Sequence, residues 1–171
     1  GDCLGGAIIG PKNQLRDIRY YWLETQGAVL SPFNAWLILR GVRTLGLRMD
    51  KHSVNAMEVA RFLENHEKVK EVVYPGLKTH PHHQVAKKQM QNFGGMIGFE
   101  LYSIKESNKF IELLKQIKVG VSLGDTTSLI EYTSLMTGID LASWEKRSMK
   151  ISDTHFRLSV GLEDLKDLIK D

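Results

Sequence analysis

Apolar residues recur at helical spacing in two stretches of the chain. The spacing i, i+3, i+4, i+7 occurs in Ala35, Ile38, Leu39 and Val42 and again in Ala56, Val59, Ala60 and Leu63. Ser31 and Pro32 precede the first stretch and suit an N-cap and a first helical position. The pattern predicts a bend, or a link between two helices, within Gly46 to His52, and we place a domain boundary near Asp50.

The first residues show a different pattern. Leu4 to Ile9 is a short apolar run closed by Gly10-Pro11, which is typical of a buried strand. Pro11 to Leu23 is compatible with a first helix. Because a buried strand needs neighbours on both sides, we expect its neighbouring strands to be encoded upstream of residue 1.

Beyond Asp50, strand and helix periods alternate. Strands are predicted at Val69 to Tyr74, along the face formed by Ile97, Phe99 and Leu101, and along the face formed by Phe156, Leu158 and Val160. Helices are predicted at His83 to Met90, through Phe110, Leu113, Leu114 and Ile117 with Ser107 as the cap, and from Glu163 onward. The expected architecture is α+β, with helices on one face of a small sheet.

Composition adds few constraints. The 171 residues are 42% hydrophobic and 25% charged, close to the averages of globular proteins. The formal charge is only +3, and the basic residues are scattered among acidic ones. That scatter argues against nucleic-acid binding, and we interpret Arg16 to Trp22 as a packing face of a helix. Cys3 is the only cysteine, which suits a reducing cytoplasm, and no apolar run approaches the roughly 20 residues of a membrane span.

Arg157 is a candidate ligand-binding residue. It lies between Phe156 and Leu158, so strand alternation places it on the opposite face, together with His155 and Ser159. A guanidinium on a rigid strand can hold a carboxylate through two parallel hydrogen bonds. From spacing alone, an exposed arginine or a structural ion pair is the simpler interpretation.

Val121 to Asp125 is a second candidate. Ser122 precedes a Gly-Asp turn, and Thr126 to Ile130 could begin a helix, so a hydroxyl and free backbone N–H groups could lie beside an anion. A strand, a turn and an N-cap explain the same residues. His80, His82 and His83 do not have the spacing of a metal site, and Pro81 interrupts any helix there, so no metal is expected.

Seven segments, in order and with matching separations, resemble one enzyme family. They are Gly1 to Gly6 (GDCLGG), Gly27 to Pro32 (GAVLSP), Arg40 to Asp50 (RGVRTLGLRMD), Val73 to Leu77 (VYPGL), Gly95 to Ile97 (GMI), Val121 to Asp125 (VSLGD) and Arg157 to Asp164 (RLSVGLED). Together they are similar to the second half of the cystathionine synthase, cystathionine lyase and methionine gamma-lyase family of fold-type I pyridoxal-phosphate enzymes.

The resemblance implies a site and an architecture. Arg157 would pair with the α-carboxylate of an amino acid substrate, Ser122 would help to hold it, and Val121 would border the side-chain pocket. Residues 1–50 would be the last strand and long helix of the large cofactor domain. Residues 51–171 would be the C-terminal substrate-side domain, with a mostly antiparallel sheet.

The resemblance also concerns the cofactor, pyridoxal 5'-phosphate. The family's cofactor lysine lies a few residues before a Gly-His-x-Asp segment, and Gly1-Asp2 resembles the end of that segment. We therefore expect the lysine upstream of Gly1 and the chain alone to be inactive. The complete enzyme would eliminate or replace a sulfur or oxygen group at the γ or β carbon, as a homotetramer built from two dimers. Methionine gamma-lyase is the best match. The cystathionine enzymes, or a non-catalytic partner from a split or truncated gene, are the alternatives.

Three positions depart from the family pattern. Gly138 stands where the family usually shows a histidine, Tyr132-Thr133 where a proline is common, and Met149-Lys150 in place of a usual glycine before Ile151. The loop near the substrate entrance is therefore expected to differ from that of the relatives.

Overall fold

The structure is a computed structural model that describes residues 1–171. The chain forms two compact units, Gly1–Gly46 and Leu47–Asp171. The first unit contains α1 (Lys12–Ile18), the π-helix η1 (Arg19–Thr25) and α2 (Pro32–Val42). The predicted start of α2 is confirmed, because the Ser31 side chain accepts a hydrogen bond from the Asn34 backbone N–H at 3.1 Å and Pro32 occupies the first turn.

Two predictions for this part of the chain are not matched within it. Residues 4–9 form no strand, and Leu4 and Ile9 are 84% and 95% exposed. A strand is defined by pairing with a neighbour, and no strand of the structure pairs with this segment. The break between the long helices falls at residues 43–44 and not within Gly46 to His52, because Thr44 closes the end of α2 by donating its N–H to the Gly41 carbonyl oxygen.

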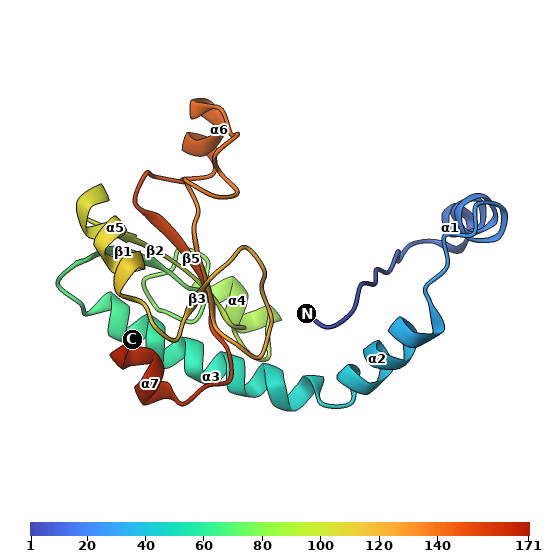
Figure 1. Cartoon of the computed structure of the whole chain (residues 1–171), viewed down its shortest axis with the longest axis horizontal. Helices are drawn as coiled ribbons and strands as arrows, with labels where there is room; N and C mark the ends of the chain where they lie inside the picture. Colours follow the sequence, from blue (N-terminus) through green and yellow to red (C-terminus); the bar gives the residue numbers. More distant parts are fainter. The chain divides into compact units, whose positions relative to one another are not determined.

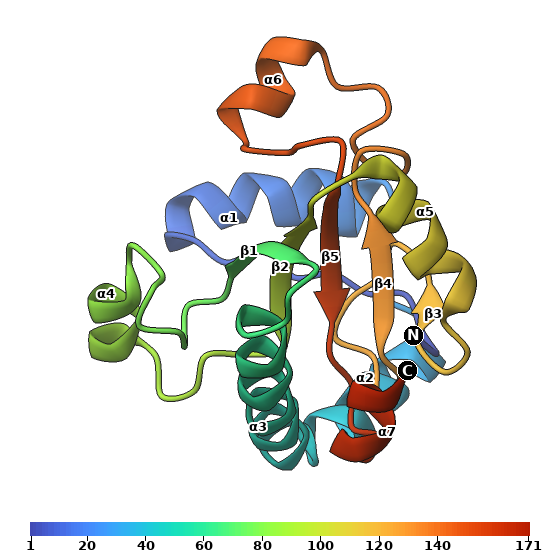
Figure 2. The same ribbon diagram turned by 90° about the vertical axis from the view of Figure 1, so that its left-hand side faces the viewer.

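The second unit is built on a five-stranded sheet of order β1-β2-β5-β4-β3 (Figures 1 and 2). All neighbouring strands are antiparallel except β3 and β4, which are parallel. The strands are β1 (Val69–Val73), β2 (Met96–Leu101), β3 (Lys118–Val119), β4 (Leu129–Tyr132) and β5 (His155–Ser159). The helices are α3 (Leu45–Glu64), α4 (His83–Gln89), α5 (Ile104–Leu113), α6 (Ser143–Ser148) and α7 (Leu165–Lys170).

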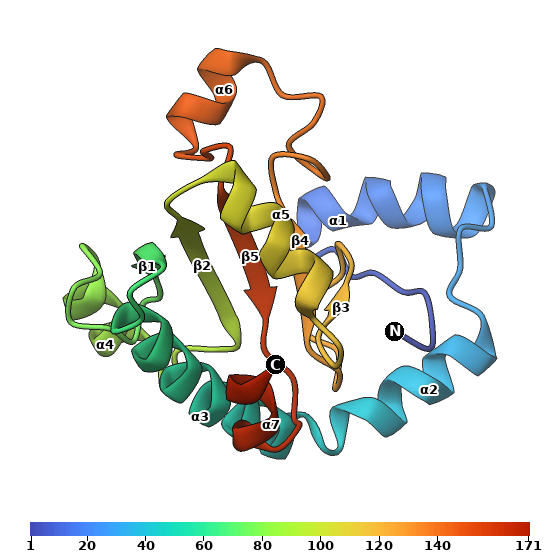
Figure 3. The same cartoon turned by 60° about the vertical axis from the view of Figure 1, so that its left-hand side comes forward.

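The core lies on one face of this sheet. Phe99 of β2 stacks on Phe156 of β5 with ring centroids 5.2 Å apart, and Phe110 of α5 meets both rings edge-on. Ala56 and Ala60 of α3 are fully buried in the same cluster. Figure 3 shows α3, α5 and α7 on this side of the sheet, so the predicted α+β arrangement with helices on one face is confirmed.

The start of α5 differs from the prediction. Ser103 is the N-cap, since its side chain accepts from the Glu106 N–H at 3.2 Å and donates to the Glu106 carboxylate at 3.1 Å. Ser107 lies buried inside the helix, and its hydroxyl donates to the Ser103 carbonyl oxygen at 3.0 Å. The apolar period continues past Leu113, but the chain becomes extended at Leu114, so the helix is shorter than its pattern.

The last helix is capped by Asp164, whose side chain accepts from the Lys166 N–H at 2.8 Å, so α7 begins at Leu165 and not at Glu163. None of the helices combines the length and the apolar content that a bilayer-spanning segment needs.

Candidate functional site

Arg157 occupies the middle of the central strand β5. Its backbone is in register with Gly98 of β2 on one side and Glu131 of β4 on the other. Phe156 and Leu158 point into the core, so the Arg157 side chain lies on the opposite face of the sheet, as strand alternation predicts. The side chain is 32% exposed, which leaves it accessible while its base is held by a rigid sheet.

Within the chain, the Arg157 guanidinium makes all of its contacts through one nitrogen, Nη2. Nη2 of Arg157 donates to the Val121 carbonyl oxygen at 2.6 Å and pairs with Oε2 of Glu131 at 2.6 Å. Nη1 and Nε have no partner in the chain. A guanidinium carries five N–H donors in a planar fork, so part of this fork is left to bind a planar anion such as a carboxylate.

The Ser122 turn lies beside this arginine. Two outward-facing side chains of β5 hold the turn: Arg157 binds Val121 O, and the Ser159 hydroxyl accepts the Gly124 N–H at 2.9 Å. Gly124 has φ of +72°, a left-handed conformation that glycine adopts without strain. The structure thus brings together Val121, Ser122 and Arg157, the three residues singled out from the sequence, and Ser122 is exposed between the two anchors.

The segment after this turn is not helical. Residues 126–128 are an irregular connection and lead into β4, so the expectation that Thr126 to Ile130 begins a helix is wrong. A backbone group of this segment pairs with the connection that follows β5: the Leu162 N–H donates to the Thr126 carbonyl oxygen at 2.8 Å. Such pairing provides hydrogen-bond partners for the backbone of residues 126–128 without a helix.

A polar cluster that the sequence patterns did not reveal fixes this connection. Glu163 accepts the Ser128 N–H at 2.5 Å and the Ser128 hydroxyl at 2.9 Å, and the Ser128 hydroxyl in turn accepts the Gly161 N–H at 2.8 Å. Asn55 of α3 donates to the carbonyl oxygens of Gly161 and Glu163 at 3.1 and 3.0 Å. Strand and helix periods do not reveal this contact, because Glu163 and Ser128 lie 35 residues apart in the sequence.

His155 lies on the same face of the sheet as Arg157. Its Nδ1 is 3.0 Å from the Thr133 hydroxyl oxygen. Burial lowers the pKa of His155, and this effect outweighs the opposite influence of the nearby Glu100 and Glu131 carboxylates. Near neutral pH the imidazole therefore adds no positive charge beside Arg157.

The histidines near Pro81 have structural contacts. His83 Nδ1 lies 2.8 Å from the Pro75 carbonyl oxygen, and the His80 ring accepts the His82 N–H at 3.2 Å. Burial and the neighbouring His82 and His83 lower the pKa of His80. No three His, Cys, Asp or Glu side chains of the chain are grouped so that they could hold a metal ion.

The lysines do not fit a covalent cofactor site. A Schiff-base lysine needs an enclosed setting that favours its neutral form. Of the fifteen lysines, Lys146 on α6 is half-buried and all the others are exposed. None of these lysines therefore matches a covalent cofactor site, and the position of the cofactor lysine outside this chain stays a prediction.

Two of the departures from the family pattern have structural counterparts. Lys150 has φ of +55°, the only non-glycine residue with positive φ, at the place where a glycine is usual. A Cβ on Gly138 would lie 2.6 Å from the Thr133 carbonyl oxygen, so a larger residue at 138 would displace this loop. The loop leads to α6, which projects away from the sheet (Figure 1).

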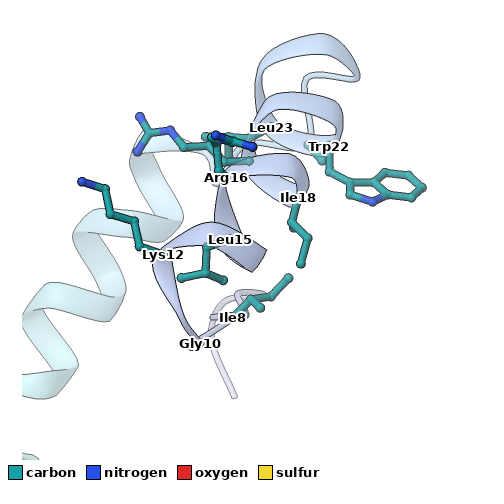
Figure 4. Close-up of a pocket in the computed structure, with 11 residues that line it drawn as sticks. Ile8, Gly10, Lys12, Leu15, Arg16, Ile18, Trp22 and Leu23 are labelled. Carbon is teal, nitrogen blue, oxygen red and sulfur yellow. The ribbon is translucent and has the colours of Figure 1, made fainter.

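A cavity of about 790 Å³ lies in the first unit. Figure 4 shows the apolar side chains of Ile8, Leu15 and Ile18 along it, with Lys12 and Arg16 among its lining residues. Neither Arg157 nor the Ser122 turn lines this cavity, and it contains no acid, thiol or hydroxyl side chain. Lys12, Arg16 and Arg19 are its ionisable lining residues, and all three are exposed.

Known proteins resemble the whole chain. The L-methionine gamma-lyase of Fusobacterium nucleatum subsp. polymorphum is 44% identical over 173 residues, covering 100% of this chain and 44% of that protein. The cystathionine beta-lyase of Coxiella burnetii is 42% identical over 172 residues, covering 99% and 44%. The chain thus spans less than half the length of the curated relatives that it matches.

Solved structures also resemble this chain. The cystathionine gamma synthase of Xanthomonas oryzae pv. oryzae superimposes with a TM-score of 0.85 at 37% identity, over 92% of this chain and 41% of that one. The putative O-acetylhomoserine (thiol)-lyase of Campylobacter jejuni, which contains a pyridoxyl-lysine phosphate, gives 0.86 at 36% identity, over 92% and 38%. Residues 1–171 also match the family described as Cys/Met metabolism PLP-dependent enzyme, where PLP is pyridoxal phosphate. The chain therefore belongs to the Cys/Met metabolism family of PLP-dependent enzymes.

Proposed function

We propose that this chain supplies the substrate-carboxylate site of a PLP-dependent enzyme that eliminates or replaces a group at the γ or β carbon of a sulfur amino acid. The observation that supports this most directly is the Arg157 guanidinium. Its Nη2 is held by Glu131 and Val121, its Nη1 and Nε have no partner in the chain, and its side chain is 32% exposed.

The role of these residues is positioning. Arg157 would bind the α-carboxylate through paired N–H groups, and the exposed Ser122 hydroxyl beside it would donate a further hydrogen bond. Val121 would limit the space for the substrate side chain. Fixing the amino acid in one orientation accelerates a reaction without any bond being made by the arginine. The lysine and the phosphate-binding residues would lie in another part of the whole protein, so the chain alone would be inactive.

The substrate is proposed from the motifs. VSLGD, GAVLSP and LRMD favour a sulfur substrate such as L-methionine, as in methionine gamma-lyase. Relatives named for cystathionine are almost as similar, so the cystathionine branch is the alternative. We further propose that residues 1–50 end the cofactor domain, that residues 51–171 form the substrate-side domain, and that the complete enzyme is a cytoplasmic homotetramer.

A second candidate is a non-catalytic partner of a cofactor-bearing chain. The observation that favours it is the apolar surface of the first unit, where Phe33, Trp36 and Leu39 of α2 are between 56% and 66% exposed. A surface of this kind usually marks an interaction site.

A chimera tests the first proposal. The upstream part of the Fusobacterium L-methionine gamma-lyase is joined to residues 1–171, and turnover of L-methionine and L-cystathionine is measured with PLP. Arg157→Lys keeps the charge but loses the fork, so kcat/KM should fall by about 10²-fold, mostly through KM. Arg147→Lys, an exposed arginine on α6, should change it less than about twofold.

Two results would contradict the proposal. Equal kcat/KM for the Arg157 and Arg147 variants would remove Arg157 from the substrate site. Turnover by the 171-residue chain with added PLP would show that the cofactor lysine lies within it.

A further inference from the structure

Glu131 is a buried carboxylate in direct contact with Arg157. It lies on β4 opposite Arg157 on β5, and its side chain is only 1% exposed. Removing a charge from water is costly unless partners compensate for it. The partners of Glu131 therefore show what holds it in place.

The two oxygens of Glu131 bind different partners. Oε2 forms an ion pair with Nη2 of Arg157 at 2.6 Å, at an angle outside hydrogen-bond geometry. Oε1 accepts the Thr137 backbone N–H at 3.2 Å and a hydrogen bond from the Thr137 hydroxyl. The carboxylate is thus anchored by the loop after β4, independently of Arg157, and presents its other oxygen in a fixed direction.

We propose that Glu131 is a positioning residue that orients the Arg157 guanidinium, so that its free N–H groups match a planar carboxylate. The inference rests on the proposed carboxylate site. An arginine side chain has many rotamers, and ordering one during binding weakens the complex. An arginine already held by Glu131 and Val121 avoids that loss.

The Arg157–Glu131 pair should favour planar carboxylates but not simple spherical anions. The Glu131 carboxylate offsets the charge of Arg157, so a spherical anion attracted by charge alone gains little. A planar carboxylate gains directed hydrogen bonds in addition. Glu131 should therefore raise the preference of the site for carboxylates over halides, and this ratio separates orientation from charge.

The test uses the 171-residue chain labelled with ¹⁵N-arginine. The Arg157 Nε signal is titrated with sodium acetate and, separately, with sodium bromide, at constant ionic strength. Glu131→Gln keeps the shape of the side chain but places an amide donor near Nη2. The ratio of acetate to bromide affinity should fall roughly tenfold, and exchange of the Arg157 N–H groups should become faster.

Two further variants control the experiment. Glu100→Gln removes another carboxylate of the same sheet, 8% exposed and paired with Lys70, and should leave the ratio unchanged. Thr137→Val keeps the Glu131 charge but removes the hydroxyl that anchors it, and should lower the ratio by roughly threefold. If Glu131→Gln does not fold, the affinity ratio of Thr137→Val tests the positioning role of Glu131.

The outcomes separate the two proposals. If Arg157→Lys leaves acetate binding unchanged, the carboxylate site itself is refuted. If Arg157→Lys weakens acetate binding but Glu131→Gln and Thr137→Val change acetate and bromide affinities in the same proportion, the site stands and the positioning role of Glu131 is refuted.

Discussion

Similar apolar sequence patterns leave side chains exposed in the first unit and buried in the second. In Gly1–Gly46 no residue is buried, and large apolar side chains such as Ile9, Phe33 and Trp36 remain exposed. In Leu47–Asp171 the apolar positions of strands and helices meet in one core, where Ala56 and Phe156 are fully buried.

The difference shows what an amphipathic pattern can and cannot do. Helix α2 has a serine N-cap, and both α2 and α3 have a regular apolar stripe. Helices of this length gain most of their stability from packing of the apolar face and little from propensity. The stripe on α3 is stabilised by the sheet, whereas the first unit offers α2 no comparable core. The second unit should therefore dominate the folding cooperativity of the chain.

The largest effect is expected from core truncation. Phe156→Ala removes a ring that contacts Phe99, Phe110 and Tyr132, and should lower the free energy of unfolding of the second unit by about 3–5 kcal/mol. Trp36→Ala on α2, at a residue that is 56% exposed, should lower it by less than about 1 kcal/mol. Urea unfolding with hydrogen exchange of the β2 and β5 amides measures both. Similar losses for the two variants would mean that the units do not differ in this way.

A pair of glycines sharpens the comparison at smaller scale. A Cβ on Gly161 would lie 2.5 Å from the Thr126 carbonyl oxygen and 2.6 Å from the Ser128 nitrogen, so Gly161→Ala should cost about 1–3 kcal/mol. Gly46, at the end of the first unit, has no atom within 4 Å of such a Cβ. Gly46→Ala should be neutral or stabilise helix α3 by up to about 1 kcal/mol. Thermal unfolding measures the two shifts, and a destabilising Gly46→Ala would reveal unexpected packing there.

The smallest expected effect is on pH dependence. All six histidines lie in the second unit. Burial lowers the pKa of His155 below its ordinary value of about 6.5, so the unfolded chain binds a proton at this residue more readily than the folded chain. Stability should therefore fall as the pH drops below about 6.5 and recover above it. Denaturant unfolding between about pH 5 and 8 measures this dependence.

His155→Asn should weaken that dependence, whereas His82→Asn, at an exposed histidine, should preserve it. If both variants keep the full dependence, protonation of His155 does not limit stability in this range.

Much of the second unit could be predicted from alternation and capping. Patterns that span a few residues predict which side chains of β2 and β5 face the core. They also predict that β1 ends before Pro75-Gly76. The strand expected at residues 4–9 has no pairing partner within the chain and stays a prediction, because pairing partners, and not apolarity, define a strand. The cap of α5 was misassigned because Ser103 and Ser107 both suit a cap, and the apolar period does not show where the helix begins.

The sequence by itself determined the family, the α+β class and the three residues proposed for the substrate site. Motifs and periodicity act locally or in fixed order, so they can be recognised without coordinates. Only the tertiary structure decided what these residues touch. Arg157 meets Glu131 and Val121, and Glu163 meets Ser128, because the order and register of β3, β4 and β5 bring distant segments together, and side-chain spacing within one strand contains no information about the neighbouring strand.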